Sequence, residues 1–173
     1  MADQISLDQF TEEWLEEVKR GNPSTVDLGN RFARKLITQW LDLDELSDDI
    51  VYCDGSGDGG IDVACLQLGE TGDDGTEDGD TWYLVQSKYG TAFAGSGTLL
   101  RECQKVVDTL DGKRTNLSSL AQDLLARLTE FRGRASERDK LILVFATEGP
   151  LTDEQKRTLE DVRAMGRQRL GTL

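Results

Sequence analysis

The chain has 173 residues and a net charge of −13, with 33 acidic against 20 basic residues. This length suits one domain with a hydrophobic core, and a hydrophobic content of 37% is typical of a globular chain. Histidine is absent, which excludes HNH-type nucleases, Ser-His-Asp and Cys-His hydrolases, and zinc sites with histidine ligands.

The cysteines and the apolar runs indicate the compartment. The three cysteines form no Cys-x-x-Cys pair and lie in or beside apolar runs, so we expect buried, unreactive thiols instead of disulfides or a zinc ribbon. No apolar run approaches the length of a membrane span, and the N-terminus lacks the basic and apolar regions of a signal peptide. We therefore expect a cytoplasmic protein without membrane contact.

The N-terminal half predicts two helices followed by three strands. The first helix opens at a capping box, Ser6-Leu7-Asp8-Gln9, and ends before Gly21. Apolar residues at helical spacing predict a second helix from about Thr25 to Leu43. Apolar, β-branched and aromatic runs then predict strands at 50–52, 61–68 and 81–88. The acidic, glycine-rich segment 69–80 is predicted to be an exposed, mobile loop.

The C-terminal half predicts two helices, a strand and a last helix, at about 99–110, 117–132, 141–145 and 152–170. A strand that follows so long a crossover is expected to pair in parallel with its neighbour. The element order predicts an α/β fold, with a mixed central sheet flanked by helices. We expect one domain over residues 1–173, with 1–24 as a helical extension and 25–173 as the core.

Two short motifs carry the chemistry: SGDGGID at Ser56–Asp62 and VQSK at Val85–Lys88. Side chains at i and i+2 of a strand share a face, so Asp62, Gln86 and Lys88 converge if the two runs are neighbouring strands. A carboxylate, an amide oxygen and a lysine around one point suit Mg²⁺-dependent phosphodiester hydrolysis. Each residue also has a purely structural interpretation: a turn that needs glycine, a solvated aspartate, and an edge-strand lysine that favours solubility.

Together, SGDGGID and YLVQSKYG resemble the nuclease core of the PD-(D/E)xK superfamily, most of all Mrr-like restriction endonucleases and abortive-infection phage-resistance (AIPR) nucleases. The resemblance runs from about Gly29 to about Thr147, and its specific part is short. It implies a restriction-endonuclease-like αβββαβ core and hydrolysis of phosphodiester bonds in DNA. It also implies a prokaryotic role in restriction or antiviral defence.

The resemblance implies a role for each motif residue. Asp62 would bind Mg²⁺ or Mn²⁺, and Lys88 would position the attacking water or stabilise charge on the phosphate. Gln86, with the backbone carbonyl of Ser87, would complete the metal or water site. Gln86 occupies a position that more often holds an acidic residue in these families.

The sequence departs from the resembled families at the second carboxylate. Those families carry a glutamate on the helix before the first strand, in a Gly-x-x-Phe-Glu pattern, and here Ala33 stands in the glutamate position. Asp58 and Asp54 are candidate replacements, and Asp27 is a weaker one. Gln104, on the helix after the third strand, is expected either to face the site or to lie exposed on that helix.

Two functions from other classes stay open. Asp54–Asp62 matches several ligand positions of a calcium loop, but Cys65 stands where the bidentate glutamate belongs, and the flanking segments are predicted strands. A calcium-binding structural module would unfold on Asp54→Ala and ignore Lys88→Ala. The alanine at the glutamate position and the acidic charge instead favour a catalytically silent nuclease-like binding or assembly domain.

The net charge bears on the expected partner, DNA. Phosphate binding favours a positive surface, whereas segment 72–80 is an acidic tract and basic residues become frequent only from Arg127 onward. DNA affinity would then come from one basic face, from a homodimer, or from a partner domain or subunit. The chain would in the last case be the N-terminal part of a longer protein.

Overall fold

The computed structural model describes residues 12–43, 49–53, 55–72, 75–88, 96–147 and 151–171. The predicted capping box at Ser6 lies outside these residues, as does Asp54. The elements in chain order are α1 (Glu12–Lys19), α2 (Thr25–Lys35), η2 (Leu36–Trp40), β1 (Ile50–Tyr52), β2 (Val63–Gln67), β3 (Thr81–Lys88), α3 (Ser96–Leu110), α4 (Ser119–Arg134), β4 (Lys140–Thr147) and α5 (Asp153–Leu170). None of the described helices is long and apolar enough to cross a membrane.

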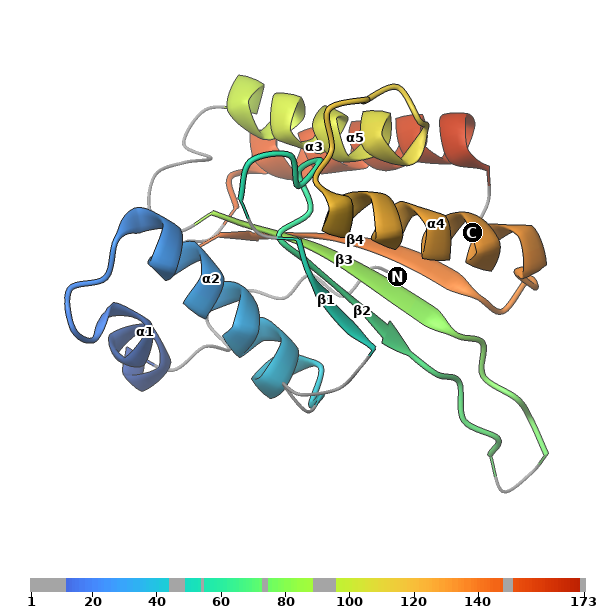
Figure 1. Ribbon diagram of the computed structural model, residues 1–173, viewed down its shortest axis with the longest axis horizontal. Coiled ribbons are helices and arrows are strands. Elements are labelled where there is room, and N and C mark those ends of the chain that lie inside the picture. The colour runs from blue at the N-terminus through green and yellow to red at the C-terminus, as the bar shows by residue number, and fades with distance from the viewer. Residues whose placement is uncertain are drawn as a thin grey trace.

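The four strands form one mixed sheet in the order β1-β2-β3-β4 (Figure 1). Strands β1, β2 and β3 are antiparallel neighbours, whereas β4 pairs with β3 in parallel along all eight residues of each strand. Helices α3 and α4 form the crossover between β3 and β4. The predicted α/β class, element order and parallel last strand are therefore confirmed.

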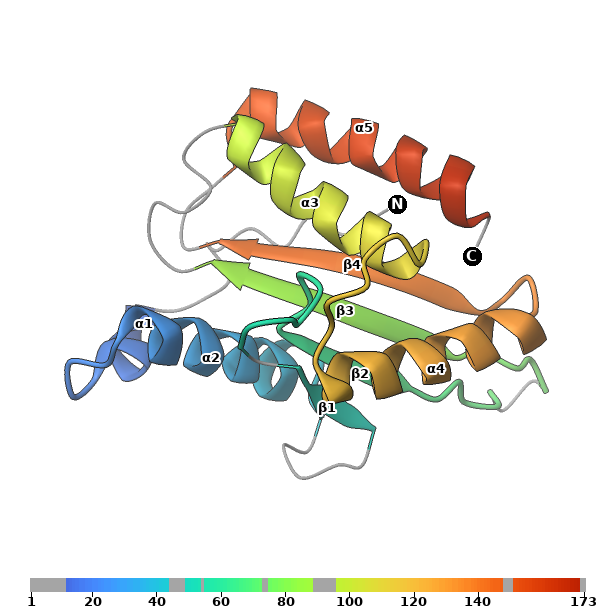
Figure 2. The ribbon, with the colours of Figure 1, turned by 45° about the horizontal axis from the view of Figure 1, so that its top comes forward.

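The sheet lies between two helical layers (Figure 2). Alternate residues of β3 serve the two faces: Val85 joins the core under α2, whereas Trp82 and Leu84 join the core under α3 and α4. Helix α1 packs against α2, and α5 packs against α3 through a third cluster around Leu99 and Val162. The start of β2 and the end of β3, which are adjacent because these strands are antiparallel, thus lie between α2 on one face of the sheet and α3 on the other.

Helix α2 begins at Thr25, as predicted, but its end differs from the prediction for residues 25–43. A capping box at its start uses Asp27, whose carboxylate accepts hydrogen bonds from the N–H and the hydroxyl of Ser24 at 3.1 and 2.6 Å. Its end widens into the π-helical turn η2, where the Leu41 N–H donates to the Leu36 carbonyl at 3.1 Å. Asp27 is therefore the N3 partner of the N-cap Ser24 in a capping box, and that explains its position without a catalytic role.

The acidic segment between β2 and β3 is more ordered than a simple loop. Thr71 and Glu77 form an isolated antiparallel bridge, and the Asp78 N–H donates to the Glu70 carbonyl at 2.9 Å. The described side chains here are largely exposed, as predicted. The segment therefore extends the β2–β3 hairpin, because its two arms remain hydrogen-bonded to each other beyond the sheet. Its mobility stays a prediction.

Candidate functional site

Asp62 is held between β1 and β3, directly before β2. Its backbone N–H donates to the Val85 carbonyl and its carbonyl accepts from the Cys53 N–H, both at 2.9 Å. Its carboxylate oxygen Oδ2 accepts hydrogen bonds from the Ser87 N–H at 2.6 Å and from the Ser87 hydroxyl at 3.2 Å. The predicted neighbourhood of Asp62 and the end of β3 is therefore present, and Ser87 is the residue that joins them.

Ser87 also connects the site to α2. Its hydroxyl donates to the Gly29 carbonyl at 2.9 Å, so its single proton is divided between Gly29 and Asp62. One turn further along α2, Ala33 is buried in the core at the position where the resembled families carry glutamate. Helix α2 therefore packs against the end of β3 here, and the buried side chain of Ala33 adds no carboxylate to the site.

The glycine-rich turn before Asp62 is packed against α3. Gly59 and Gly60 have φ angles of +71° and +87°, and a Cβ on Gly59 would lie 2.6 Å from the Thr109 side chain. The Thr109 hydroxyl in turn donates to the Gly59 carbonyl at 2.7 Å. The close approach of α3 therefore explains the glycines, which agrees with the interpretation of this segment as a turn that needs glycine.

Asp58 lies in the same turn and close to Asp62. Its Oδ1 accepts a hydrogen bond from the Gly60 N–H at 2.7 Å. Burial, and after it the negative charges of Asp58 and Asp62, raise the pKa of the Cys53 thiol to about 11. Both carboxylates therefore disfavour the ionised form of this thiol.

Gln86 is buried, with 2% of its surface exposed. Its side-chain Nε2 donates to Oε2 of Glu102 on α3 at 3.1 Å. Its Oε1 is buried and accepts no hydrogen bond from any residue that the structure describes. Buried carbonyl oxygens are almost always partnered, so this atom marks a position that favours a cation or a hydrogen-bond donor.

Glu102 is the site residue that sequence reasoning missed. It is 9% exposed, and the Lys105 ammonium lies 2.9 Å from both of its carboxylate oxygens. A signal was present: Glu102 stands three residues after Leu99 and four before Val106, so it lies on the apolar stripe of α3. Gln104, proposed from sequence, is exposed on the same helix, and the contact with Gln86 comes from Glu102.

Lys88 is the last residue of β3 and pairs with Thr147 of β4, so the predicted strand 81–88 is confirmed along its whole length. The side chain of Lys88 lies outside the described part of the structure. Within the described ranges, no three Asp, Glu, Cys or His side chains form a group that could hold a metal ion. The oxygens at the site are instead carboxylates of Asp62 and Asp58 and the amide oxygen of Gln86.

The flanks of the glycine-rich turn also bear on the calcium-loop alternative. Residues on both sides belong to strands, β1 and β2, whereas an EF-hand loop joins two helices. The carboxylate of Asp58 is directed to the Gly60 N–H, and Oδ2 of Asp62 to Ser87. The site therefore resembles the end of a sheet more than a calcium loop.

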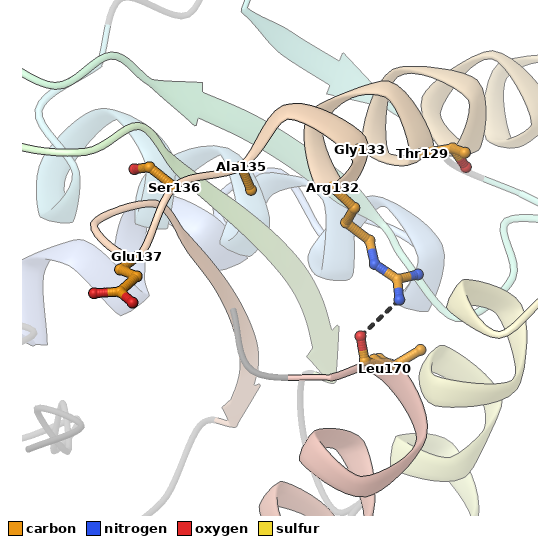
Figure 3. Close-up of a pocket in the computed structure, with 7 residues that line it drawn as sticks. All are labelled: Thr129, Arg132, Gly133, Ala135, Ser136, Glu137 and Leu170. Carbon is orange, nitrogen blue, oxygen red and sulfur yellow. Dashed lines mark hydrogen bonds between the residues drawn. The ribbon is translucent and has the colours of Figure 1, made fainter.

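A pocket of about 430 Å³ lies at the C-terminal end of α4 (Figure 3). Arg132 crosses it and donates to the Leu170 carbonyl at 2.7 Å, and Ser136 and Glu137 lie on its other side. None of the predicted site residues lines it. It is therefore separate from the chemistry at the ends of β2 and β3.

A second pocket, of about 520 Å³, is rich in positive charge. It lies between α1 and α2, and we call it the basic groove; its charged lining residues are Glu17, Arg20, Arg31, Arg34 and Lys35. Arg31 donates to the carbonyls that end α1, at Val18 and Arg20, and Lys35 pairs with Glu17. Four cationic side chains against one carboxylate make this groove a local exception to the net negative charge.

Several basic residues from position 127 onward, like those of the basic groove, also have partners within the fold. Arg169 of α5 forms ion pairs at 2.7 Å with Asp108 of α3 and with Asp111, the residue after that helix, and Arg138 donates to the Glu77 carbonyl at 2.8 Å. Arg127 lies over the Trp82 ring. These side chains therefore tie elements of the fold together, which weakens the expectation of a basic face formed by the C-terminal part of the chain.

Comparison of the chain with protein-family models, with curated proteins and with solved structures gives no significant match. The functional argument therefore rests on the residues themselves and on their geometry.

Proposed function

We propose that this protein is a metal-dependent DNA endonuclease with a PD-(D/E)xK-like site, similar to Mrr-like and AIPR nucleases. The observation that carries the proposal is the end of β3. Ser87 donates a hydrogen bond to the Asp62 carboxylate there. The adjacent Gln86 donates to Glu102 through its NH₂ group, and its buried amide oxygen has no partner among the described residues. Lys88 follows two residues after Gln86 on the same strand.

The donor set supports Mg²⁺ or Mn²⁺ as the cofactor. Both ions prefer oxygen ligands, and Mg²⁺ sites combine one or two carboxylates with water and substrate phosphate oxygens. Asp62 and the Gln86 Oε1 would hold the ion, with the Ser87 carbonyl and Asp58 as further oxygens. The bound ion would supply positive charge to the scissile phosphate and to the attacking water.

The chain's own residues would divide the remaining work. The Ser87 N–H holds the Asp62 carboxylate in one orientation by donating to its Oδ2 atom. The second carboxylate oxygen of Asp62, Oδ1, therefore faces a fixed direction. Lys88 would orient the attacking water and stabilise the negative charge that develops on the phosphate. The turn that leads to Asp62 is packed against α3 at Gly59 and hydrogen-bonded to Thr109.

DNA contact is supported by the basic groove between α1 and α2. Helix α2 carries three of its cationic side chains and also contacts Ser87 through Gly29, so one helix joins the groove to the site. Arg and Lys side chains bind phosphate oxygens without reading sequence. A homodimer or a partner domain would add affinity and would allow both strands of a duplex to be cut, in a restriction or antiphage role.

The proposal is tested by cleavage of supercoiled DNA in Mg²⁺ or Mn²⁺ by wild type, Asp62→Asn and Lys88→Ala. The matched control is Lys140→Ala, because Lys140 is an exposed lysine at the opposite end of the β3–β4 pair. We expect metal-dependent cutting that is retained in the control and lost in both site variants. Equal cutting by wild type and Lys88→Ala would remove Lys88 from the chemistry.

A catalytically silent nuclease-like domain is the second candidate. It is favoured because, among the described residues, no three acidic or thiol side chains form a group that could hold a metal ion. A silent domain would bind DNA or a partner protein through the same surfaces without binding Mn²⁺ at Asp62. Failure of wild type to cut DNA and to bind Mn²⁺ would favour this function.

A further inference from the structure

We propose that Glu102 is a positioning residue that fixes the Gln86 amide so that its oxygen, and never its NH₂ group, faces a bound cation. The inference rests on the proposed metal site and adds a residue that the sequence motifs do not contain. It explains how a neutral glutamine serves where related sites carry an acidic residue.

The orientation of Gln86 follows from the chemistry of its partner. An ionised carboxylate only accepts hydrogen bonds, so the Gln86 group that faces Glu102 at 3.1 Å must be the NH₂ donor. The oxygen and the nitrogen of the planar amide leave its carbon in different directions. The Oε1 atom is therefore directed away from Glu102, which leaves it buried and without a described partner.

Lys105 keeps this arrangement in place. A carboxylate on the apolar stripe of α3 would be costly to bury without a partner. The Lys105 ammonium, 2.9 Å from both of its oxygens, is that partner. An ionised Glu102 accepts hydrogen bonds from both Lys105 and Gln86 and can donate none. The Gln86 side chain must therefore be the donor in its hydrogen bond with Glu102.

This fixed donor role matters because an amide without such a partner can present either its oxygen or its NH₂ group to the site. If the Gln86 side chain turned over, its partly positive NH₂ group would face the cation, and the repulsion would oppose binding. Residues that orient a metal ligand from behind typically contribute about 10- to 100-fold to metal affinity. Glu102 is expected to act in this range without contacting the ion.

The test is a cycle of variants whose Mn²⁺ affinity is measured by calorimetry: wild type, Glu102→Gln, Gln86→Glu and the double variant. Glu102→Gln should weaken binding by about tenfold or more, because the introduced amide both donates and accepts and leaves Gln86 free to turn. Gln86→Glu alone places two carboxylates in contact and should lower stability. Gln104→Ala, on the exposed side of α3, is the matched control and should bind as wild type does.

The double variant Gln86→Glu/Glu102→Gln keeps the hydrogen bond with reversed polarity and the same net charge. It should fold like wild type and bind Mn²⁺ at least as tightly, which protects the test if Glu102→Gln unfolds. Unchanged affinity in Glu102→Gln, or a folded double variant that binds about tenfold or more weakly, would overturn the positioning role alone.

The metal site itself is judged by Asp62→Asn in the same titration. Wild type that binds no Mn²⁺, or binding that Asp62→Asn leaves intact, would overturn this inference and the proposed cofactor together. Binding that depends on Asp62 and Glu102 in a protein that cuts no DNA would support the positioning role and contradict the nuclease.

Discussion

Replacement of Asp62 should destabilise the fold, independently of any catalytic role. Its carboxylate accepts a 2.6 Å hydrogen bond from the Ser87 N–H, and Ser87 is only 4% exposed. A hydrogen bond to a charged group contributes about 1.5–3 kcal/mol, and a buried N–H left without an acceptor costs about 1–3 kcal/mol. These terms overlap, so we expect Asp62→Ala to lower the free energy of unfolding by about 2–3 kcal/mol.

The isosteric variant should behave differently. Asp62→Asn keeps an oxygen that accepts from Ser87 but loses the charge, so the expected cost is about 1 kcal/mol. At about 2–4 °C per kcal/mol for a domain of this size, Asp62→Ala should melt about 4–12 °C below wild type. Asp62→Asn is therefore the informative variant for function, because its loss of activity would not follow from unfolding.

The assay is urea unfolding followed by tryptophan fluorescence, to which the buried Trp82 contributes, together with thermal melting. Asp78→Ala is the control, since this carboxylate belongs to the exposed end of the hairpin and should change stability by no more than about 0.5 kcal/mol. If Asp62→Ala matched this control, the hydrogen bonds to Ser87 would contribute nothing, and the proposed anchoring of the carboxylate would be refuted.

Other perturbations test the glycine-rich turn, the thiols and an ion pair. Gly59→Ala should cost about 1–3 kcal/mol in urea unfolding, because the turn needs a positive φ and α3 occupies the space of a Cβ; an unchanged midpoint would contradict this geometry. Iodoacetamide at about pH 8 should label none of the cysteines in the native protein and all of them in urea, as mass spectrometry would report. The reason is that burial is the main cause that raises the pKa of Cys53 to about 11 and of the other two thiols to about 12, and rapid native labelling would oppose it. Hydrogen bonds from Lys113 and Arg169 lower the pKa of Asp111, so its stabilising effect should be complete above the unfolded value of about 4 and fade as the pH falls through the lower folded value. Asp111→Asn should therefore flatten the acid side of a plot of melting temperature against pH, and an unaltered slope would argue against the pairing.

Much of the fold was predictable because its signals are local. The apolar and aromatic run within 81–88 predicts β3 to the residue, and the long crossover predicts the parallel pairing of β4. The π-turn at Leu36–Trp40 was not predictable, since it changes hydrogen bonding without changing the apolar pattern. The paired arms of the hairpin were missed for a similar reason, because glycine and acidic residues disfavour strands in isolation.

The candidate site was predictable in part. The motifs predict Asp62 and Gln86 on neighbouring strands; β2 begins one residue later, at Val63, and Asp62 reaches β3 through its N–H, which donates to the Val85 carbonyl. They do not reveal that Ser87 anchors the carboxylate, because this contact depends on how the chain bends before β2. Glu102 stood on an apolar stripe, an unusual place for a carboxylate, but only the packing of α3 on the sheet identifies Gln86 as its partner.

The central claim is that Asp62 and the end of β3 form a metal-dependent nuclease site. The most direct test is the rate of DNA cleavage as a function of Mn²⁺ concentration, measured side by side for wild type and folded Asp62→Asn. The account predicts a rate that saturates with Mn²⁺ and is abolished by EDTA in wild type, with no cleavage by the variant. Cleavage that persists in Asp62→Asn, or a folded wild type that cuts nothing at any Mn²⁺ concentration, would contradict it.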